Sequence, residues 1–447
     1  MGKLFGTDGV RGIANKELTP ELAYRLGRAG GYVLAKEAAR PLVVVGKDTR
    51  ISGDMLEGAL IAGLCSMGAD VIKVGVIPTP AVAYLTTKYG ANCGAVISAS
   101  HNPYEFNGIK FFGPTGYKLP DEVEESIEEL VLKEMDEGER PTGRDIGRVL
   151  EEVGAEKDYA DFCLSCYEEE KALSGLTVVI DCANGASYKV APHVWRRLGA
   201  KVIPIHCEPD GVNINDRCGS THPQSLIKAV LENQADLGLA YDGDADRVVA
   251  VDETGTLVDG DHIMVICGLH LNHKGRLNPA RVVATVMSNV GLKQAFQSHG
   301  IEVYECPVGD RYVLEEMIKT GAKMGGEQSS HIIFMDHATT GDGLVSPLKL
   351  VEVMKATGLP LSKLAAQMKT YPQILVNLDT ENKDTILDVV EVKEAIARAE
   401  EKLGDWGRIL VRPSGTEPKI RVMAQGPDET LLKEVVGDIK KVIDRYR

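Results

Sequence analysis

The chain has 447 residues, and its 44% hydrophobic and 26% charged content is ordinary for a soluble globular protein of about two to four domains. The formal net charge of −15 excludes a general nucleic-acid binder, which would carry a basic excess. No apolar run reaches the roughly 18–20 residues of a membrane span, and the N-terminus lacks a signal-peptide pattern. The nine cysteines are scattered, and the Cys163/Cys166 pair has no second pair at zinc spacing. We therefore expect a reduced cytoplasmic protein with neither membrane nor nucleic-acid partners.

Three consecutive regions repeat one pattern of short runs rich in Val and Ile. Helical patterns separate the first two runs, most clearly at 55–62 and 191–198. Strand, helix and strand at this spacing predict βαβ units and a largely parallel, well-covered sheet in each region. The runs are 42–45, 71–74 and 95–97 in the first region, 178–180, 202–205 and 237–240 in the second, and 282–286, 301–304 and 322–324 in the third.

The third run of each region leads into an unusual polar loop. We call residues 98–103 the serine loop, 242–247 the aspartate loop and 326–331 the glutamate loop. In open α/β sheets, ligands bind beyond the carboxyl ends of the strands. Three loops at equivalent places therefore predict three related domains that face one central cleft.

The C-terminal part of the chain has a different pattern. Strand-like runs at 408–411 and 419–424 flank a tight turn at 412–418, the arginine loop, and an amphipathic helix is predicted at 429–446. This predicts a smaller α+β domain. The acidic stretch 121–140 is predicted to be a solvated helix and the segment by which the chain leaves it (its exit). The polar stretch 382–388 is predicted to be a loop. The predicted domains are 1–155, 156–255, 256–368 and 369–447.

The aspartate loop carries three carboxylates that alternate with small residues. Asp242, Asp244 and Asp246 can turn inward together, and three hard oxygen donors suit Mg²⁺ or Ca²⁺. An EF-hand is rejected because its sixth position is Arg247 instead of glycine and because 248–251 is strand-like. A solvated acidic turn is disfavoured because clustered carboxylates repel each other without a cation.

Ser100 follows an apolar run, where a serine is most often a simple turn residue. Its neighbours add chemistry, because His101 can donate or accept a proton and Lys110 can offer a cation to a phosphoryl group. The GxSxG elbow of serine hydrolases is absent. A hydrolase triad is therefore not indicated.

The arginine loop has the composition of an anion cradle, although a plain hairpin turn has similar residues. Gly415 lets backbone amides converge, Ser414 and Thr416 add hydroxyl donors, and Arg412 and Arg421 add charge. Near the start of the chain, the glycine-rich stretch 5–12 contains Arg11. Cations thus gather around polar loops in a chain that is acidic overall, as an anionic ligand would require.

Taken together, these loops resemble the α-D-phosphohexomutases, from 5–12 to 412–418 and in the order of that family. The stretches 213–215, 218–223 and 339–343, and Gln328, resemble the branch of the family that acts on glucosamine phosphates. The resemblance implies four domains around a cleft and a phosphorylated Ser100. It also implies one Mg²⁺ held by that serine with Asp242, Asp244 and Asp246.

The resemblance also assigns expected roles to the remaining residues. Glu327 and Ser329 would hold sugar hydroxyls, and Arg11, His101, Lys110, Arg247 and His331 would assist the phosphoryl and proton transfers. The non-reacting phosphate of the substrate would lie on Arg412, Ser414, Gly415, Thr416 and Arg421.

The implied reaction interconverts glucosamine 6-phosphate and glucosamine 1-phosphate through a 1,6-bisphosphate, toward UDP-N-acetylglucosamine. The partner is thus a small phosphosugar, and a homodimer is compatible with the resemblance. Mannose or glucose phosphates are alternative substrates, and a phosphatase using the same phosphoserine, or a phosphosugar sensor without catalysis, are further alternatives. Two residues depart from the family pattern: Ser330 replaces the glycine of Glu-Gln-Ser-Gly-His, and Phe106 replaces an aspartate or tyrosine.

Overall fold

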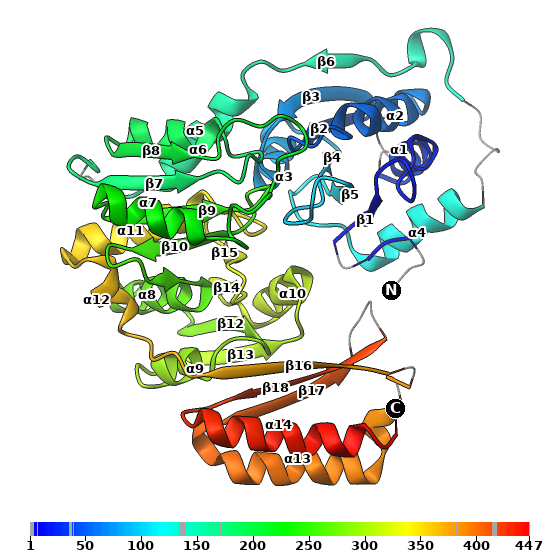
Figure 1. Ribbon diagram of the computed structural model, residues 1–447. Coiled ribbons are helices and arrows are strands. Elements are labelled where there is room, and N and C mark those ends of the chain that lie inside the picture. Colours follow the sequence, from blue (N-terminus) through cyan, green and yellow to red (C-terminus); the bar gives the residue numbers. More distant parts are fainter. Residues whose placement is uncertain are drawn as a thin grey trace.

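The computed structural model describes residues 4–6, 8–34, 38, 40–133, 140–169, 172–380, 382–383, 385–413 and 418–446. Within them, four sheets follow one another along the chain and form an arc (Figure 1). No helix in these ranges is both long and apolar enough to cross a membrane.

The first sheet has six strands in the order β1-β5-β4-β2-β3-β6. Helices α1, α2 and α4 pack on one face, and α3 packs on the other. The central strands are almost continuously apolar, as expected for strands covered on both faces. The elements are β1 (Val10–Ile13), α1 (Pro20–Leu34), β2 (Leu42–Lys47), α2 (Gly53–Ser66), β3 (Asp70–Val76), α3 (Thr79–Lys88), β4 (Cys93–Ile97), β5 (Phe106–Phe112), α4 (Asp121–Leu132), a 3₁₀ turn (Gly143–Asp145) and β6 (Val149–Glu151).

The second sheet has five strands in the order β11-β10-β9-β7-β8. Its helix α7 packs on one face of β7 and β9, while α5 and α6 belong to the large core on the other face. The elements are α5 (Ala155–Ser165), β7 (Thr177–Asp181), α6 (Val190–Arg197), β8 (Lys201–Ile205), α7 (Gln224–Asn233), β9 (Leu237–Tyr241), β10 (Val248–Asp252) and β11 (Leu257–Val258).

The third sheet has four strands in the order β13-β12-β14-β15. Two of its helices begin at side-chain caps, because Asp259 accepts a hydrogen bond from the N–H of His262 and Asn289 accepts one from that of Gly291. The elements are α8 (Gly260–His273), β12 (Arg281–Thr285), α9 (Val290–Gln297), β13 (Glu302–Cys306), α10 (Asp310–Thr320), β14 (Met324–Gly326), β15 (Ile332–Phe334), α11 (Val345–Thr357) and α12 (Leu361–Ala365).

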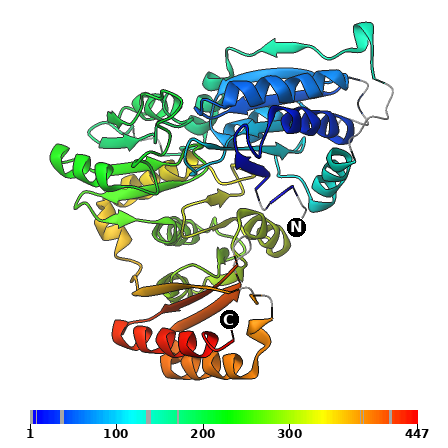
Figure 2. The same cartoon turned by 45° about the vertical axis from the view of Figure 1, so that its right-hand side comes forward.

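The fourth sheet is antiparallel, in the order β16-β18-β17, and it is smaller than the others. Figures 1 and 2 both place α13 and α14 on its outer face, away from the other three domains. Asp428 caps α14 by accepting from the N–H groups of Thr430 and Leu431. The elements are β16 (Gln373–Asp379), a 3₁₀ turn (Ile386–Asp388), α13 (Val390–Leu403), a 3₁₀ turn (Gly404–Trp406), β17 (Arg408–Pro413), β18 (Lys419–Gln425) and α14 (Glu429–Ile443).

The first three sheets share one topology, which confirms the predicted repeat. Counted from β2, β7 and β12, the first strand of each repeat pairs in parallel with the second and third, and the third pairs antiparallel with a fourth. The serine, aspartate and glutamate loops each join the third strand to the fourth. All three polar loops therefore lie at the same carboxyl edge of equivalent strands.

The prediction of a solvated helix at 121–140 is wrong in one respect. Helix α4 is acidic on one side, but it packs against α1 and buries Ile127 and Val131 in the core of the first domain. Val123, Ile127 and Val131 recur every four residues, and this period places them on one face of a helix. The predicted exit at 134–139 lies outside the described residues.

Candidate active site

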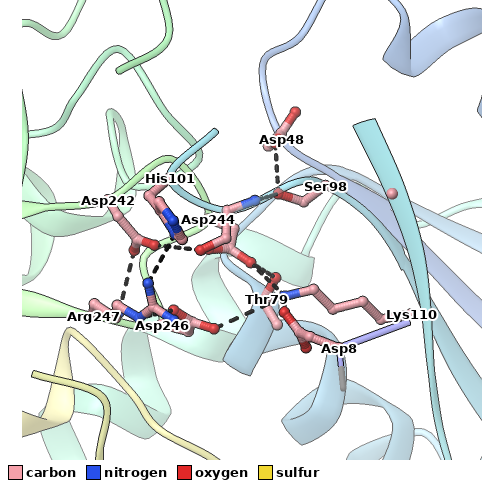
Figure 3. A network of polar contacts seen from close by, with 12 residues as sticks. Asp8, Asp48, Thr79, Ser98, His101, Lys110, Asp242, Asp244, Asp246 and Arg247 are labelled. Carbon is pink, nitrogen blue, oxygen red and sulfur yellow. Dashed lines mark hydrogen bonds and ion pairs between the residues drawn. The ribbon is translucent and has the colours of Figure 1, made fainter. Parts of the chain in front are cut away.

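Ser100 lies in the serine loop between β4 and β5, and only 1% of its surface is exposed. Its backbone has a positive φ of 51°, a conformation that few residues other than glycine adopt. The N–H of Ser100 donates to Ser98 Oγ at 2.9 Å. The Ser98 hydroxyl in turn donates to Asp48 Oδ2 at 2.6 Å (Figure 3). The loop is thus held in a strained conformation by buried hydrogen bonds.

Arg50 is the main support of this loop, a role that was not predicted from the sequence. Its side chain is fully buried and its Nε donates to Asp48 Oδ2 at 2.9 Å. The planar guanidinium has five donors in a fixed geometry, which suits several carbonyl groups of one loop. Its Nη atoms donate to the carbonyl oxygens of Ser100 (3.0 Å), Asn102 (2.8 Å), Pro103 and Phe106 (2.9 Å).

The aspartate loop joins β9 to β10 and faces the serine loop from the second domain (Figure 3). The side chains of Asp242, Asp244 and Asp246 are buried, and each offers a carboxylate oxygen within 4.8 Å of the others. Ser100 Oγ donates to Asp242 Oδ2 at 2.6 Å. The structure therefore brings together the four side chains that were expected to share one metal ion.

The three carboxylates form a site that fits a divalent metal ion. The second oxygens of Asp244 and Asp246 are buried and make no hydrogen bond within the described residues. Burial and the two other aspartates raise the pKa of Asp242 well above its ordinary value. A cation among hard oxygen donors would satisfy these atoms and relieve the repulsion.

Backbone contact between the two loops depends on Gly243. A Cβ atom at this position would lie 2.6 Å from the carbonyl oxygen of Ser100, closer than side chains pack. Asn215 adds a second link, because its Nδ2 donates to the carbonyl oxygens of Ser100 (2.9 Å) and Asn102 (3.1 Å). The serine and aspartate loops therefore fix each other's positions.

Lys110 lies on β5 with its ammonium group buried among carboxylates. Its Nζ is 3.1 Å from Asp244 Oδ2, 2.9 Å from Asp8 Oδ2 and 3.9 Å from Asp246 Oδ2. Burial lowers the pKa of Lys110, but Asp244 and Asp8 outweigh burial and raise it above its ordinary value. Asp244 Oδ2 also accepts from the hydroxyl of Thr79 at 2.6 Å. Lys110 thus supplies a fixed positive charge beside the aspartates.

Arg247 and His101 lie together at the junction of the two loops. The Nη1 atom of Arg247 donates to His101 Nδ1 at 2.8 Å, since a guanidinium can only donate. Burial and Arg247 lower the pKa of His101 to about 4, so the ring is neutral at neutral pH. Arg11, predicted at the same site, lies on β1 in an ion pair with Asp8.

The glutamate loop approaches from the third domain. Gly341 donates its N–H to His331 Nε2 at 3.0 Å, and His331 Nδ1 lies 3.6 Å from Asp246 Oδ2. Glu327 is buried, and its Oε1 accepts from the N–H of Gly309 at 3.1 Å. Ser329 is exposed, and its hydroxyl donates to Glu327 Oε2 at 3.4 Å. His331 therefore links the third domain to the aspartate loop.

The arginine loop is described only in part. Ser414, Gly415 and Thr416 lie outside the described residues. Arg412 on β17 and Arg421 on β18 are paired directly across the sheet. Burial and the charge of Arg421 lower the pKa of Arg412. Two like charges side by side form a concentrated positive patch that favours an anion.

Comparison with known proteins gives matches along nearly the whole chain. The phosphoglucomutase/phosphomannomutase family matches with its alpha/beta/alpha domain I at residues 2–138, domain II at 157–255, domain III at 259–371 and its C-terminal domain at 375–442. The phosphoglucosamine mutase of Syntrophomonas wolfei is 62% identical over 447 residues, which is all of this chain and 99% of that protein. The phosphoglucosamine mutase of Carboxydothermus hydrogenoformans is 60% identical over 445 residues, all of both chains.

Solved structures share the fold. A phosphoglucomutase/phosphomannomutase family protein from Burkholderia thailandensis has a TM-score of 0.81 at 23% identity, over 98% of this chain and 97% of that one. The N-acetylphosphoglucosamine mutase of Aspergillus fumigatus, solved with GlcNAc-6P and magnesium, has a TM-score of 0.70 at 16% identity, over 99% and 96% of the two chains. With four matching domains in order and relatives 60–62% identical at full length, this chain belongs to the phosphoglucomutase/phosphomannomutase family.

Proposed function

We propose that this chain interconverts glucosamine 6-phosphate and glucosamine 1-phosphate, with Ser100 as a reversible carrier of the phosphoryl group. The observation that carries the proposal is the position of Ser100 Oγ, 2.6 Å from Asp242 at the edge of a buried aspartate triad. Relatives that share 60–62% of their residues with this chain over its full length are named phosphoglucosamine mutases. This sequence similarity supports glucosamine phosphates, rather than other hexose phosphates, as the substrates.

The reaction consists of two phosphoryl transfers. In the first, O1 of glucosamine 6-phosphate forms a bond to the phosphorus on Ser100, the P–Oγ bond breaks, and the proton of the O1 hydroxyl is removed. The resulting 1,6-bisphosphate turns over within the site. In the second transfer, Ser100 Oγ takes the 6-phosphoryl group, O6 regains a proton, and glucosamine 1-phosphate leaves. Positioning and charge stabilisation contribute most of the catalysis in such transfers.

One Mg²⁺ held by Asp242, Asp244, Asp246 and the group on Ser100 would neutralise negative charge on the phosphoryl group. Lys110 and Arg247 already provide fixed positive charge around the same point. Their burial strengthens this effect, because charges act more strongly where water is excluded. Lys110, whose ammonium group can donate a proton, and His331 are our candidates for proton transfer, and His101 supports the serine loop.

Substrate binding is assigned to the third and fourth domains. Glu327 and Ser329 of the third domain would hold sugar hydroxyls. In addition, Arg11 of the first domain would contact the phosphoryl group. A single seat for the non-reacting phosphate explains how either end of the bisphosphate can be presented to Ser100. That seat would consist of Arg412, Ser414, Gly415, Thr416 and Arg421.

A panel of hexose phosphates tests this assignment, assayed in both directions with and without Mg²⁺. We expect the highest kcat/KM with glucosamine phosphates and no turnover after metal removal. Higher kcat/KM with mannose or glucose phosphates would contradict the choice of glucosamine. Release of inorganic phosphate faster than isomerisation would instead identify a phosphatase. A homodimer and a cytoplasmic location stay predictions, which sedimentation and cell fractionation would check.

A further inference from the structure

A second group of metal-binding side chains lies in the second domain. Asp181, His206 and Cys218 each offer one ligand atom, and these atoms all lie within 4.8 Å of one another. None of the three belongs to the site assigned to phosphoryl transfer. Cys218 begins the stretch 218–223, which carries part of the family resemblance but has no role in the proposed reaction.

The sheet brings these residues together from three separate segments. Asp181 ends β7, and its pairing with Ile205 on the parallel strand β8 places His206 beside it. His206 Nδ1 lies 3.0 Å from Asp181 Oδ2. The same carboxylate oxygen accepts from the N–H of Gly219 at 3.0 Å, and this bond holds Cys218 against the pair. Two strand ends and one loop therefore converge on a single carboxylate.

The burial of the three side chains differs in a way that suits an entering ion. Asp181 and Cys218 are fully buried, while the His206 side chain is 31% exposed. The Nδ1 atom of His206 is itself shielded from solvent, and it makes no hydrogen bond of good geometry within the part of the chain that is described. The cluster thus contains an imidazole nitrogen whose neighbour is the Asp181 carboxylate, 3.0 Å away, and it has one side open to solvent.

The donor set indicates which ion would bind. A thiolate, an imidazole and a carboxylate together suit Zn²⁺ and similar late divalent ions, whereas Mg²⁺ prefers oxygen donors alone. Bonds of about 2.0–2.3 Å in a tetrahedral arrangement place donors about 3.3–3.7 Å apart, so small shifts of the side chains would close the site. We propose that Asp181, His206 and Cys218 form a second metal site, selective for Zn²⁺-type ions, with water as the fourth ligand.

Such an ion would act on the loop that supports Ser100. The backbone N–H of Asn215 donates to the carbonyl oxygen of Ala183, two residues after Asp181, at 2.9 Å. The side chain of Asn215 holds the carbonyl oxygen of Ser100 at 2.9 Å. An ion bound by His206 and Cys218 would therefore fix both ends of the segment 206–218, which carries Asn215.

Titration of the full chain with Co²⁺, in the presence of saturating Mg²⁺, tests this site directly. Cobalt takes the place of zinc and produces a thiolate charge-transfer band in the near ultraviolet. We expect this band to saturate at one equivalent. Cys218→Ser should abolish it, and His206→Gln should weaken Co²⁺ binding at least tenfold, while Zn²⁺ should displace the cobalt.

Cys207→Ser is the matched control, because Cys207 adjoins His206 but directs its thiol to the carbonyl oxygen of Ile205 at 3.3 Å. This variant should keep the band. Absence of the band in the unmodified chain with excess Co²⁺, its persistence in Cys218→Ser, or its loss in Cys207→Ser would each overturn the proposal. If Cys218→Ser does not fold, unchanged Co²⁺ affinity in His206→Gln overturns it. None of these readouts depends on mutase activity.

Discussion

Ser330 has a φ of 70°, so the residue that replaces the glycine of the family pattern stands in a left-handed conformation. Its hydroxyl is buried without a hydrogen bond among the described residues. Glycine adopts this conformation without steric cost, and the change also removes the unpaired hydroxyl. We expect Ser330→Gly to raise the free energy of unfolding by about 1 kcal/mol, measured by urea denaturation.

The variant Ser330→Ala separates the two causes. It removes the hydroxyl but keeps the Cβ atom, so it should give only part of the gain. A lower free energy of unfolding for Ser330→Gly than for the unmodified chain would contradict the assigned strain.

The serine loop, as an element, depends on one buried arginine. Lysine keeps the charge of Arg50 but cannot donate to four carbonyl groups and to Asp48 at once. Because small misplacements of a reacting atom can cost about 10²-fold in rate, we expect Arg50→Lys to lower kcat about 100-fold. KM for the sugar phosphate should change little, since Arg50 contacts the loop and not the substrate. Steady-state kinetics provides the test.

Arg40→Lys is the control for this change, because Arg40 pairs with Asp70 at the surface. It should leave kcat unchanged. Equal losses in the two variants, or a rise in KM without a fall in kcat for Arg50→Lys, would show that Arg50 does not position Ser100.

The position of the aspartate loop depends instead on the absence of a side chain at Gly243. A methyl group there would push against the carbonyl oxygen of Ser100 and separate the two loops. We expect Gly243→Ala to reduce kcat about 100-fold and to destabilise the fold by about 1–3 kcal/mol. Gly437→Ala on α14, where nothing lies within 4 Å, is the matched control and should be neutral or slightly stabilising. Full activity in Gly243→Ala would contradict the contact.

The sequence predicted the elements that carry side-chain chemistry better than those that support them. The aspartates, Ser100 and the repeated strands had clear patterns of residue type and spacing. Arg50 had none, because its partners are backbone carbonyl groups of a loop 50 residues away. One signal was available: Asp48 and Arg50 follow the first strand run, at the same sheet edge as the three polar loops. Strand β16 and helix α13 were not predicted either, although α13 buries Val392, Ala395, Ala399 and Leu403 at a helical spacing that the sequence carries.

At the scale of the whole molecule, three domains meet at the aspartate triad. Ser100 comes from the first domain, the aspartates from the second and His331 from the third. A metal ion that binds only the folded arrangement stabilises the chain by about 2.7 kcal/mol at 100 times its dissociation constant. We therefore expect Mg²⁺ to raise Tm relative to NaCl at equal ionic strength, measured by calorimetry. Asp244→Asn should remove most of this shift. An equal shift in both proteins would contradict metal binding at the triad.

The central claim is that Ser100 carries the phosphoryl group reversibly, and a single-turnover transfer experiment tests it most directly. The chain would be labelled with [³²P]phosphate by incubation with labelled sugar bisphosphate, freed of ligand, and mixed with unlabelled glucosamine 6-phosphate and Mg²⁺. We predict that label leaves Ser100 and appears in glucosamine bisphosphate and glucosamine 1-phosphate, with none as inorganic phosphate. Ser100→Ala should neither take up label nor turn over substrate. Labelling of Ser100→Ala, or mutase activity above a few per cent in that variant, would contradict the account.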